Sequence, residues 1–234
     1  MTRRPVLKSV GVVSGCVVLL IGVIGFAHTP AGRPLLGAMG RAFRKGACPL
    51  GYDRAATPQA REQMRASFAR SHRGQLVAES RPALGFELDR TSRAEVLSFM
   101  AARGVTCQPA TAMADLICPA VPGGVLAADF QLGRSLELWF NFGTGDKLIA
   151  VIATSREADA RQISAAFSKV TDKLAREAGP ATKVSGKGDA PSLAAGTLRQ
   201  ASSEFAFADY YALARATNMG RDFMLTEEYR SLPN

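Results

Sequence analysis

The chain has 234 residues, of which 47% are hydrophobic, and a formal net charge of +9. The positive charge lies before residue 82: residues 1–81 hold 13 Lys and Arg against 3 Asp and Glu, whereas residues 82–234 hold 16 against 17. A nucleic-acid-binding domain carries its basic patch on the folded part of the chain. The distribution therefore argues against nucleic acid as a partner.

Residues 9–27 form an uninterrupted apolar run, SVGVVSGCVVLLIGVIGFA, without a charged side chain. A helix of this length can cross a hydrocarbon core of about 30 Å. Arg3, Arg4 and Lys8 stand immediately before it. We therefore expect residues 1–28 to be an N-terminal transmembrane anchor that makes the protein a single-pass membrane protein.

Two other interpretations of the apolar run stay open. Gly25-Phe26-Ala27 is a small-residue site at which a secretory signal could be cleaved. Val13-Ser14-Gly15-Cys16 is similar to a lipoprotein signal, but the chain stays apolar for another ten residues, where a lipidated cysteine would be followed by a polar tether.

Residues 29–81 are expected to form a basic, helical juxtamembrane tether. Pro34–Lys45 is typical of a short amphipathic helix, which either lies among lipid headgroups, packs on the domain or continues the span. Pro58–Arg73 predicts a second helix with a thin apolar face, and we expect it to be solvated. Anionic headgroups attract such basic segments, so residues 9–27 and this segment predict contact with membrane lipid.

From residue 82 to residue 234 the pattern predicts one globular α+β domain, with an antiparallel sheet and packed helices in two layers. Leu84–Leu88 indicates a short strand, and Ser92 to Glu95 fits a capping box that opens a helix ending at Gly104. Alternating residues then predict a hairpin of Leu136–Phe142 and Leu148–Ala153. The remaining expected elements are a long helix at Glu157–Ala178, a loop at Val184–Pro191, and strands at Ser203–Thr217 and Phe223–Tyr229 joined by a tight turn.

The run LGFELDRTSRAEVLSFMAARG, followed by a β-hairpin, resembles small periplasmic domains of the outer-membrane assembly lipoprotein E (SmpA/OmlA) type. The resemblance covers residues 84–153. It implies a strand, a Thr-led turn and a helix before an antiparallel sheet in a periplasmic protein. The chain departs from that family because it lacks a convincing lipobox and adds a long helix and C-terminal strands, so no site residue is carried over.

Cys107 and Cys118 stand at the two ends of CQPATAMADLIC, in a polar segment with Pro109 that predicts a loop or irregular hairpin. We expect the two to form a disulfide, which implies an oxidising compartment; two buried thiols in a reduced protein are the alternative. Basic residues flank the apolar run on both sides, so the cysteines decide the orientation. They favour an extracytoplasmic, periplasmic domain.

The sequence offers no catalytic signature, and we expect the protein not to be an enzyme and to hold no cofactor. The two histidines, His28 and His72, lie in the basic N-terminal region, where we expect them to be solvated. Residues 82–234 therefore cannot supply a Ser-His-Asp arrangement or a histidine-containing metal site. Asp209-Tyr210-Tyr211 and Glu227-Glu228-Tyr229 place carboxylates near tyrosines, and we interpret them as edge residues and cross-strand pairs.

Trp139 falls on the strand face opposite the Leu and Phe residues of Leu136–Phe142. It marks either a surface for a protein partner or a second packed layer. We therefore expect a membrane-anchored extracytoplasmic interaction or scaffold domain. The alternative is a domain that binds a small hydrophobic or lipid ligand between helix Glu157–Ala178 and the sheet, and a large apolar pocket would favour it.

Overall fold

The computed structural model describes residues 58–110, 114–122, 126 and 136–233. The chain divides between residues 53 and 54, and all described residues belong to the second unit, Arg54–Asn234. The expected transmembrane helix at residues 9–27 and the expected helix Pro34–Lys45 lie outside the described residues. Within the described ranges, no helix has the length and apolar character needed to cross a membrane.

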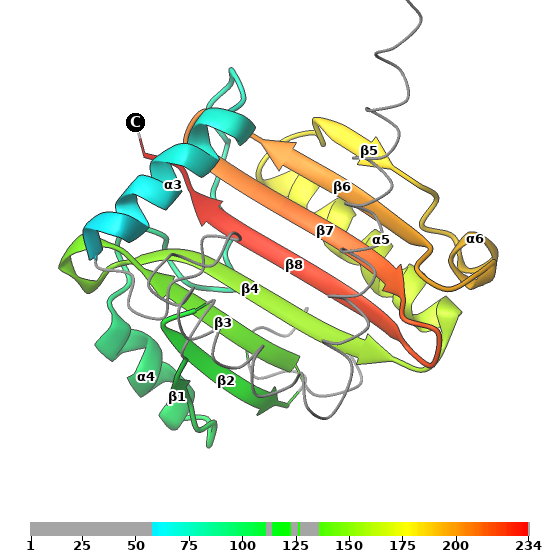
Figure 1. Ribbon diagram of the computed structural model, residues 1–234, viewed down its shortest axis with the longest axis horizontal. Coiled ribbons are helices and arrows are strands. Elements are labelled where there is room, and N and C mark those ends of the chain that lie inside the picture. Colours follow the sequence, from blue (N-terminus) through cyan, green and yellow to red (C-terminus); the bar gives the residue numbers. More distant parts are fainter. Residues whose placement is uncertain (1–57, 111–113, 123–125, 127–135, 234) are drawn as a thin grey trace, which may run out of the picture. The chain divides into compact units, whose positions relative to one another are not determined.

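An antiparallel sheet of eight strands forms the centre of the domain (Figure 1), in the order β1-β2-β3-β4-β8-β7-β6-β5. The strands are β1 (Gln108–Pro109), β2 (Leu116–Val121), β3 (Leu136–Phe142), β4 (Leu148–Glu157), β5 (Lys183–Ser185), β6 (Gln200–Ala206), β7 (Tyr210–Asn218) and β8 (Phe223–Ser231). With the helices packed against it, this sheet confirms the expected α+β class.

Helices lie on both faces of the sheet. They are α3 (Pro58–His72), α4 (Arg93–Ala101), α5 (Ala160–Glu177) and the short α6 (Ala190–Ala194), with a 3-10 turn at Thr144–Asp146. In the view of Figure 1, α5 lies behind the sheet and α3 in front of it. The fold therefore has more than the two expected layers, because α3 adds a partial third layer on the second face of the sheet.

The main core lies on the face of the sheet that α5 covers, and α4 contributes the buried Val96 and Met100 to the same cluster. The long helix presents the apolar stripe that its spacing predicts, Ile163, Phe167, Val170 and Leu174, and all four side chains are buried. Along β3 the buried Leu and Phe residues alternate with half-buried Glu137, Trp139 and Asn141, as expected of a strand with one buried face. The β3–β4 hairpin and the capping box at Ser92 are also confirmed.

Four expected elements differ from the structure, because contacts that the local pattern does not show override it. The expected loop Val184–Pro191 overlaps a strand at Lys183–Ser185 and a helix at Ala190–Ala194. Leu84–Leu88 forms turns in place of a strand, with Leu84 and Gly85 both at positive φ. The expected strand Ser203–Thr217 is two strands, since the chain reverses between Phe207 and Tyr210. The long helix begins at Ala160 because Asp159 caps it, while Glu157 stays in β4.

The helix expected at Pro58–Arg73 is present as α3, but it is not a solvated tether. Ala69 is buried, and the ring of Phe68 meets Tyr211 edge-on at 5.0 Å. His72, expected to be solvated, stacks on Phe68 at a centroid distance of 4.0 Å. Packed segments therefore extend before residue 82, on the N-terminal side of the expected domain boundary.

Candidate functional site

A pocket of about 360 Å³ lies between α5 and the sheet. Three parts of the chain form its wall: the loop 82–86, the C-terminal half of α5, and β8. The lining residues are Pro82, Ala83, Leu84, Gly85, Phe86, Val170, Lys173, Leu174, Glu177, Glu227 and Tyr229. Most of these side chains are apolar, and the charged ones are few.

The loop 82–86 is held in place at both ends. The hydroxyl of the buried Tyr210 donates to the Pro82 carbonyl at 2.5 Å. At the other end, the Phe86 ring packs edge-on against Phe140, with centroids 5.3 Å apart. The turn between them closes through a hydrogen bond from the Phe86 amide to the Ala83 carbonyl. The loop is therefore a fixed wall of the pocket.

The helix α5 supplies an apolar wall and a charged rim. Val170 and Leu174 belong to the buried stripe that faces the sheet. Lys173 and Glu177, one helical turn apart, form an ion pair with each other. Each of these two side chains is about one-third exposed, at 34% and 38%, so the pair lies where the pocket meets solvent.

Glu227 is the buried polar group of the pocket. Its residue is 1% exposed, and the neighbours directly opposite it in the sheet are Ala153 and Ala214, whose small side chains leave room for it. The Tyr229 hydroxyl donates to its Oε2. Among the described residues Tyr229 is its hydrogen-bond partner, and no hydrogen bond to Oε1 is found there.

Burial changes the acidity of both groups. It raises the pKa of the Glu227 carboxyl from 4.5 to about 7, and the hydrogen bond from Tyr229 opposes part of this rise. Burial also raises the pKa of Tyr229 well above its ordinary value, so its hydroxyl stays protonated. Near neutral pH the carboxyl of Glu227 can therefore accept or release a proton inside a largely apolar pocket.

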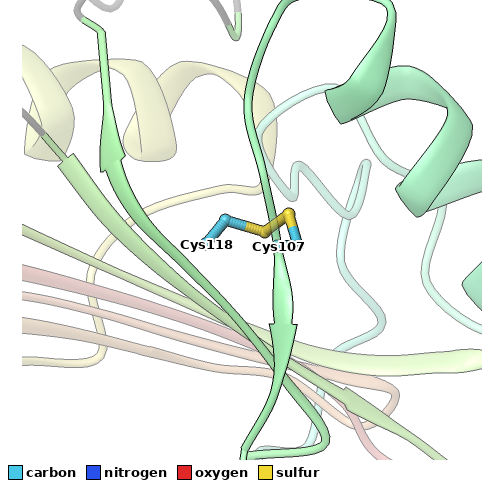
Figure 2. The surroundings of a disulfide bond; sticks show 2 residues. All are labelled: Cys107 and Cys118. Atoms are coloured by element: carbon cyan, nitrogen blue, oxygen red, sulfur yellow. A yellow bond between two sulfur atoms is a disulfide. The ribbon is translucent and has the colours of Figure 1, made fainter.

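The disulfide between Cys107 and Cys118 is present, as expected (Figure 2). The Cα atoms of the two cysteines are 4.1 Å apart, and the bridge joins the residue immediately before β1 to β2. This hairpin is the one that the polar segment between the cysteines predicts. Neither cysteine lines the pocket.

Trp139 lies on the face of the sheet opposite the pocket. Its neighbours across the strands are Ile117 and Ile152, and its indole N–H donates to Glu137. The side chain is half-buried. Its expected placement opposite the Leu and Phe row is confirmed, whereas its role as a partner surface stays a prediction.

Sequence reasoning missed Glu227. The sequence predicts that Asp209–Tyr211 and Glu227–Tyr229 are edge residues and cross-strand pairs. Strands β7 and β8 do pair with each other, but both are central strands of the sheet and not edges. The available signal was the alternation along Phe223–Ser231, which places Glu227 on the same buried face as Leu225 and Tyr229. A carboxylate at such a position is rarely buried without a function or a partner.

Neither a metal centre nor a relative points to another site. No group of three or more His, Cys, Asp or Glu side chains is placed to hold a metal ion in the part of the chain that the structure describes. No protein-family model, curated protein or solved structure matches the chain. The geometry of the pocket alone therefore defines the candidate site.

Proposed function

We propose that the domain binds a small, largely apolar molecule in the pocket between α5 and β8. The observation that carries this proposal is the pocket itself, whose volume of about 360 Å³ falls within the range of small-molecule sites. Such sites combine apolar walls with a few buried polar groups that orient the ligand. Val170, Leu174 and Phe86 supply the walls here, and Glu227 supplies the polar group.

A role as an interaction or scaffold domain is the second proposal. Ile117, Trp139 and Ile152 lie side by side on neighbouring strands and would form the contact. All three are half-buried, and Trp139 is not among the exposed large hydrophobic side chains of the described residues. A protein-binding patch usually exposes more apolar surface, so the pocket is the better supported of the two sites.

We also propose that the domain faces an extracytoplasmic compartment and that residues 9–27 anchor it in the membrane. The disulfide supports the first part, because such bonds persist in oxidising environments. The apolar run and the basic segment after it support the second. Sequencing the N-terminus of the mature protein tests the anchor, since a start at His28 would show that the run is cleaved.

The ligand proposal is tested by filling the pocket. The full chain in zwitterionic lipid nanodiscs is titrated with hexan-1-ol and 2-phenylethanol, and ligand-observed NMR measures binding against empty nanodiscs. Val170→Phe places a ring in the pocket and is expected to abolish binding. Lys169→Phe adds the same ring at the neighbouring exposed position of α5 and is expected to leave binding unchanged.

Three results would contradict the proposal. One is the absence of binding of either alcohol to the unmodified protein. The other is equal binding by the Val170→Phe variant when its circular dichroism and melting temperature show that it is folded. The third is a loss of binding in both variants. It would show that any added ring on α5 prevents binding, whether or not the ring enters the pocket.

A further inference from the structure

We propose that the pocket selects apolar molecules that carry a positively charged amine, and that Glu227 binds this amine. This inference rests on the proposed ligand-binding function and adds the chemical class of the ligand. It follows from the partners of Glu227, from the charges that surround it and from the apolar walls that would receive the rest of the molecule.

The first observation is that Glu227 has no cation beside it among the described side chains. Its hydrogen-bond partner is the neutral hydroxyl of Tyr229. The lysine of the pocket, Lys173, is engaged in the ion pair with Glu177 at the rim. A buried carboxylate without a cationic partner is unfavourable, and a ligand ammonium group would provide that partner through a charge-assisted hydrogen bond to Oε1.

The second observation is the sign of the charges around the pocket. The titratable and charged side chains near Glu227 come from β8, β7, α5 and the segment before the loop, and they are Tyr229, Tyr210, Lys173, Glu177 and Arg81. Arg81 forms an ion pair with Asp89, and both tyrosines are neutral because burial raises each pKa. The lining itself holds two carboxylates and one lysine. An anionic ligand would therefore meet repulsion, and a cationic ligand would restore the balance.

The protonation of Glu227 is consistent with a preference for a cationic ligand. Burial raises the pKa of its carboxyl to about 7, so an ammonium ligand must displace the proton when it binds in slightly acidic solution. The affinity for an amine is therefore expected to rise between pH 6 and pH 8. A fatty acid would show the opposite trend, because it binds best when Glu227 is protonated and neutral.

The test compares three ligands of equal length with different head groups: hexylamine, hexan-1-ol and hexanoate. Each is titrated by calorimetry into the full chain in zwitterionic nanodiscs, with empty nanodiscs subtracted. At pH 8 we expect hexylamine to bind roughly tenfold more tightly than hexan-1-ol, and hexanoate to bind most weakly. The hexylamine affinity should fall several-fold at pH 6.

The variant Glu227→Gln keeps the shape of the side chain and removes its charge. It is expected to lower the hexylamine affinity roughly tenfold and to leave the hexan-1-ol affinity within about twofold. The matched control is Glu228→Gln, the same substitution at the next residue of β8, whose side chain lies on the other face and pairs with Arg230. The control should leave all three affinities unchanged.

The possible failures are distinguishable. Equal binding of hexylamine and hexan-1-ol that is lost in Val170→Phe would overturn the selection for amines and leave the ligand-binding function standing. Tightest binding by hexanoate would also overturn it. A similar loss in Glu227→Gln and Glu228→Gln would remove Glu227 as the amine-binding group. If none of the three ligands binds, the proposed function fails and this inference fails with it.

Discussion

On the face of the sheet that α5 covers, buried apolar side chains extend from β2 to β6, whereas on the α3 face the buried cluster is Ala69, Tyr211, Leu213 and Leu232. Helix α3 is held on the sheet largely by polar contacts. Arg65 pairs with Asp89 at 2.6 Å, and Arg61 pairs with Asp115 at 2.5 Å. Helix α5 is thus part of the main core, whereas α3 packs on the opposite face of the sheet through a small apolar cluster and polar contacts.

The difference has a consequence for function. The pocket and Glu227 lie on the α5 face, where the protein can exclude water and set the acidity of a carboxyl group. The residues that line the pocket include none from α3. We therefore expect changes on the α5 face to alter stability and ligand binding, and changes on the α3 face to alter stability modestly and binding little.

The largest effect is expected from removing apolar volume on the α5 face. Ile163 is fully buried, and we expect Ile163→Ala to lower the free energy of unfolding by about 4 kcal/mol. Phe68→Ala on α3 should cost about 1–2 kcal/mol, because the Phe68 ring is only half-buried. Urea unfolding of the full chain in detergent, followed by the fluorescence of Trp139, measures both. Equal losses would show that the two faces do not differ.

The next effect is a pH dependence that belongs to Glu227. Its folded-state pKa of about 7 exceeds the ordinary value of 4.5, so between these pH values the folded protein binds more protons than the unfolded chain. The contribution of this group to stability is therefore highest below pH 4.5 and falls, by about 3 kcal/mol, as the pH rises to 7. Glu227→Gln should remove this fall, whereas Glu228→Gln should retain it. Parallel pH profiles for the protein and its Glu227→Gln variant would contradict the assignment.

The disulfide is expected to contribute about 3 kcal/mol, the value of the loop-entropy model for its 11-residue separation. Replacing Cys107 and Cys118 together with serine should lower the urea midpoint accordingly and leave the ligand affinities unchanged, since neither residue lines the pocket. Cys48→Ser is the control. Thiol labelling of the denatured, unreduced protein should find Cys107 and Cys118 blocked, and free labelling of both would refute the bond in solution.

Truncated chains compare two domain boundaries, the one before Arg54 that the structure shows and the one at residue 82 that the sequence predicts. A chain that begins at Arg54 retains α3, and one that begins at Pro82 lacks it and exposes Tyr211, Leu213 and Leu232. We expect both to melt cooperatively, with the shorter chain less stable by about 2 kcal/mol. An aggregated product from the shorter chain would show that α3 is part of the core. Equal melting temperatures would support the boundary at residue 82.

The elements that the sequence predicts well are those with a strong local signal. The stripe from Ile163 to Leu174 repeats at helical spacing, Leu136–Phe142 alternates, and Ser92 with Glu95 makes both bonds of a capping box. The disulfide followed from a polar segment short enough to return on itself. In each case the sequence signal lies within a segment of about a dozen residues or fewer.

The features that the sequence missed depend on contacts between distant segments. Leu84–Leu88 has the residues of a strand, but it serves as a pocket wall because Tyr210 and Phe140 hold it from elsewhere in the chain. Glu227 looks like a surface residue until β8 is placed in the middle of the sheet. The thin apolar face of α3 indicated solvation, yet Asp89 and Ser231 supply the polar contacts that dock it.

The smallest effect on stability is expected at the polar contact between Arg65 of α3 and the sheet. The Arg65 guanidinium donates to Asp89 and to the Ser231 carbonyl, and its side chain is 15% exposed. Arg65→Ala should cost about 1 kcal/mol, because Asp89 retains Arg81 as a partner. The exposed Arg70 on the same helix provides the control, and Arg70→Ala should have no measurable effect. Hydrogen exchange should show faster opening of α3 in Arg65→Ala with unchanged protection in α5. Equal acceleration in both helices would mean that α3 and α5 unfold as one unit, and the two faces would then share a single stability.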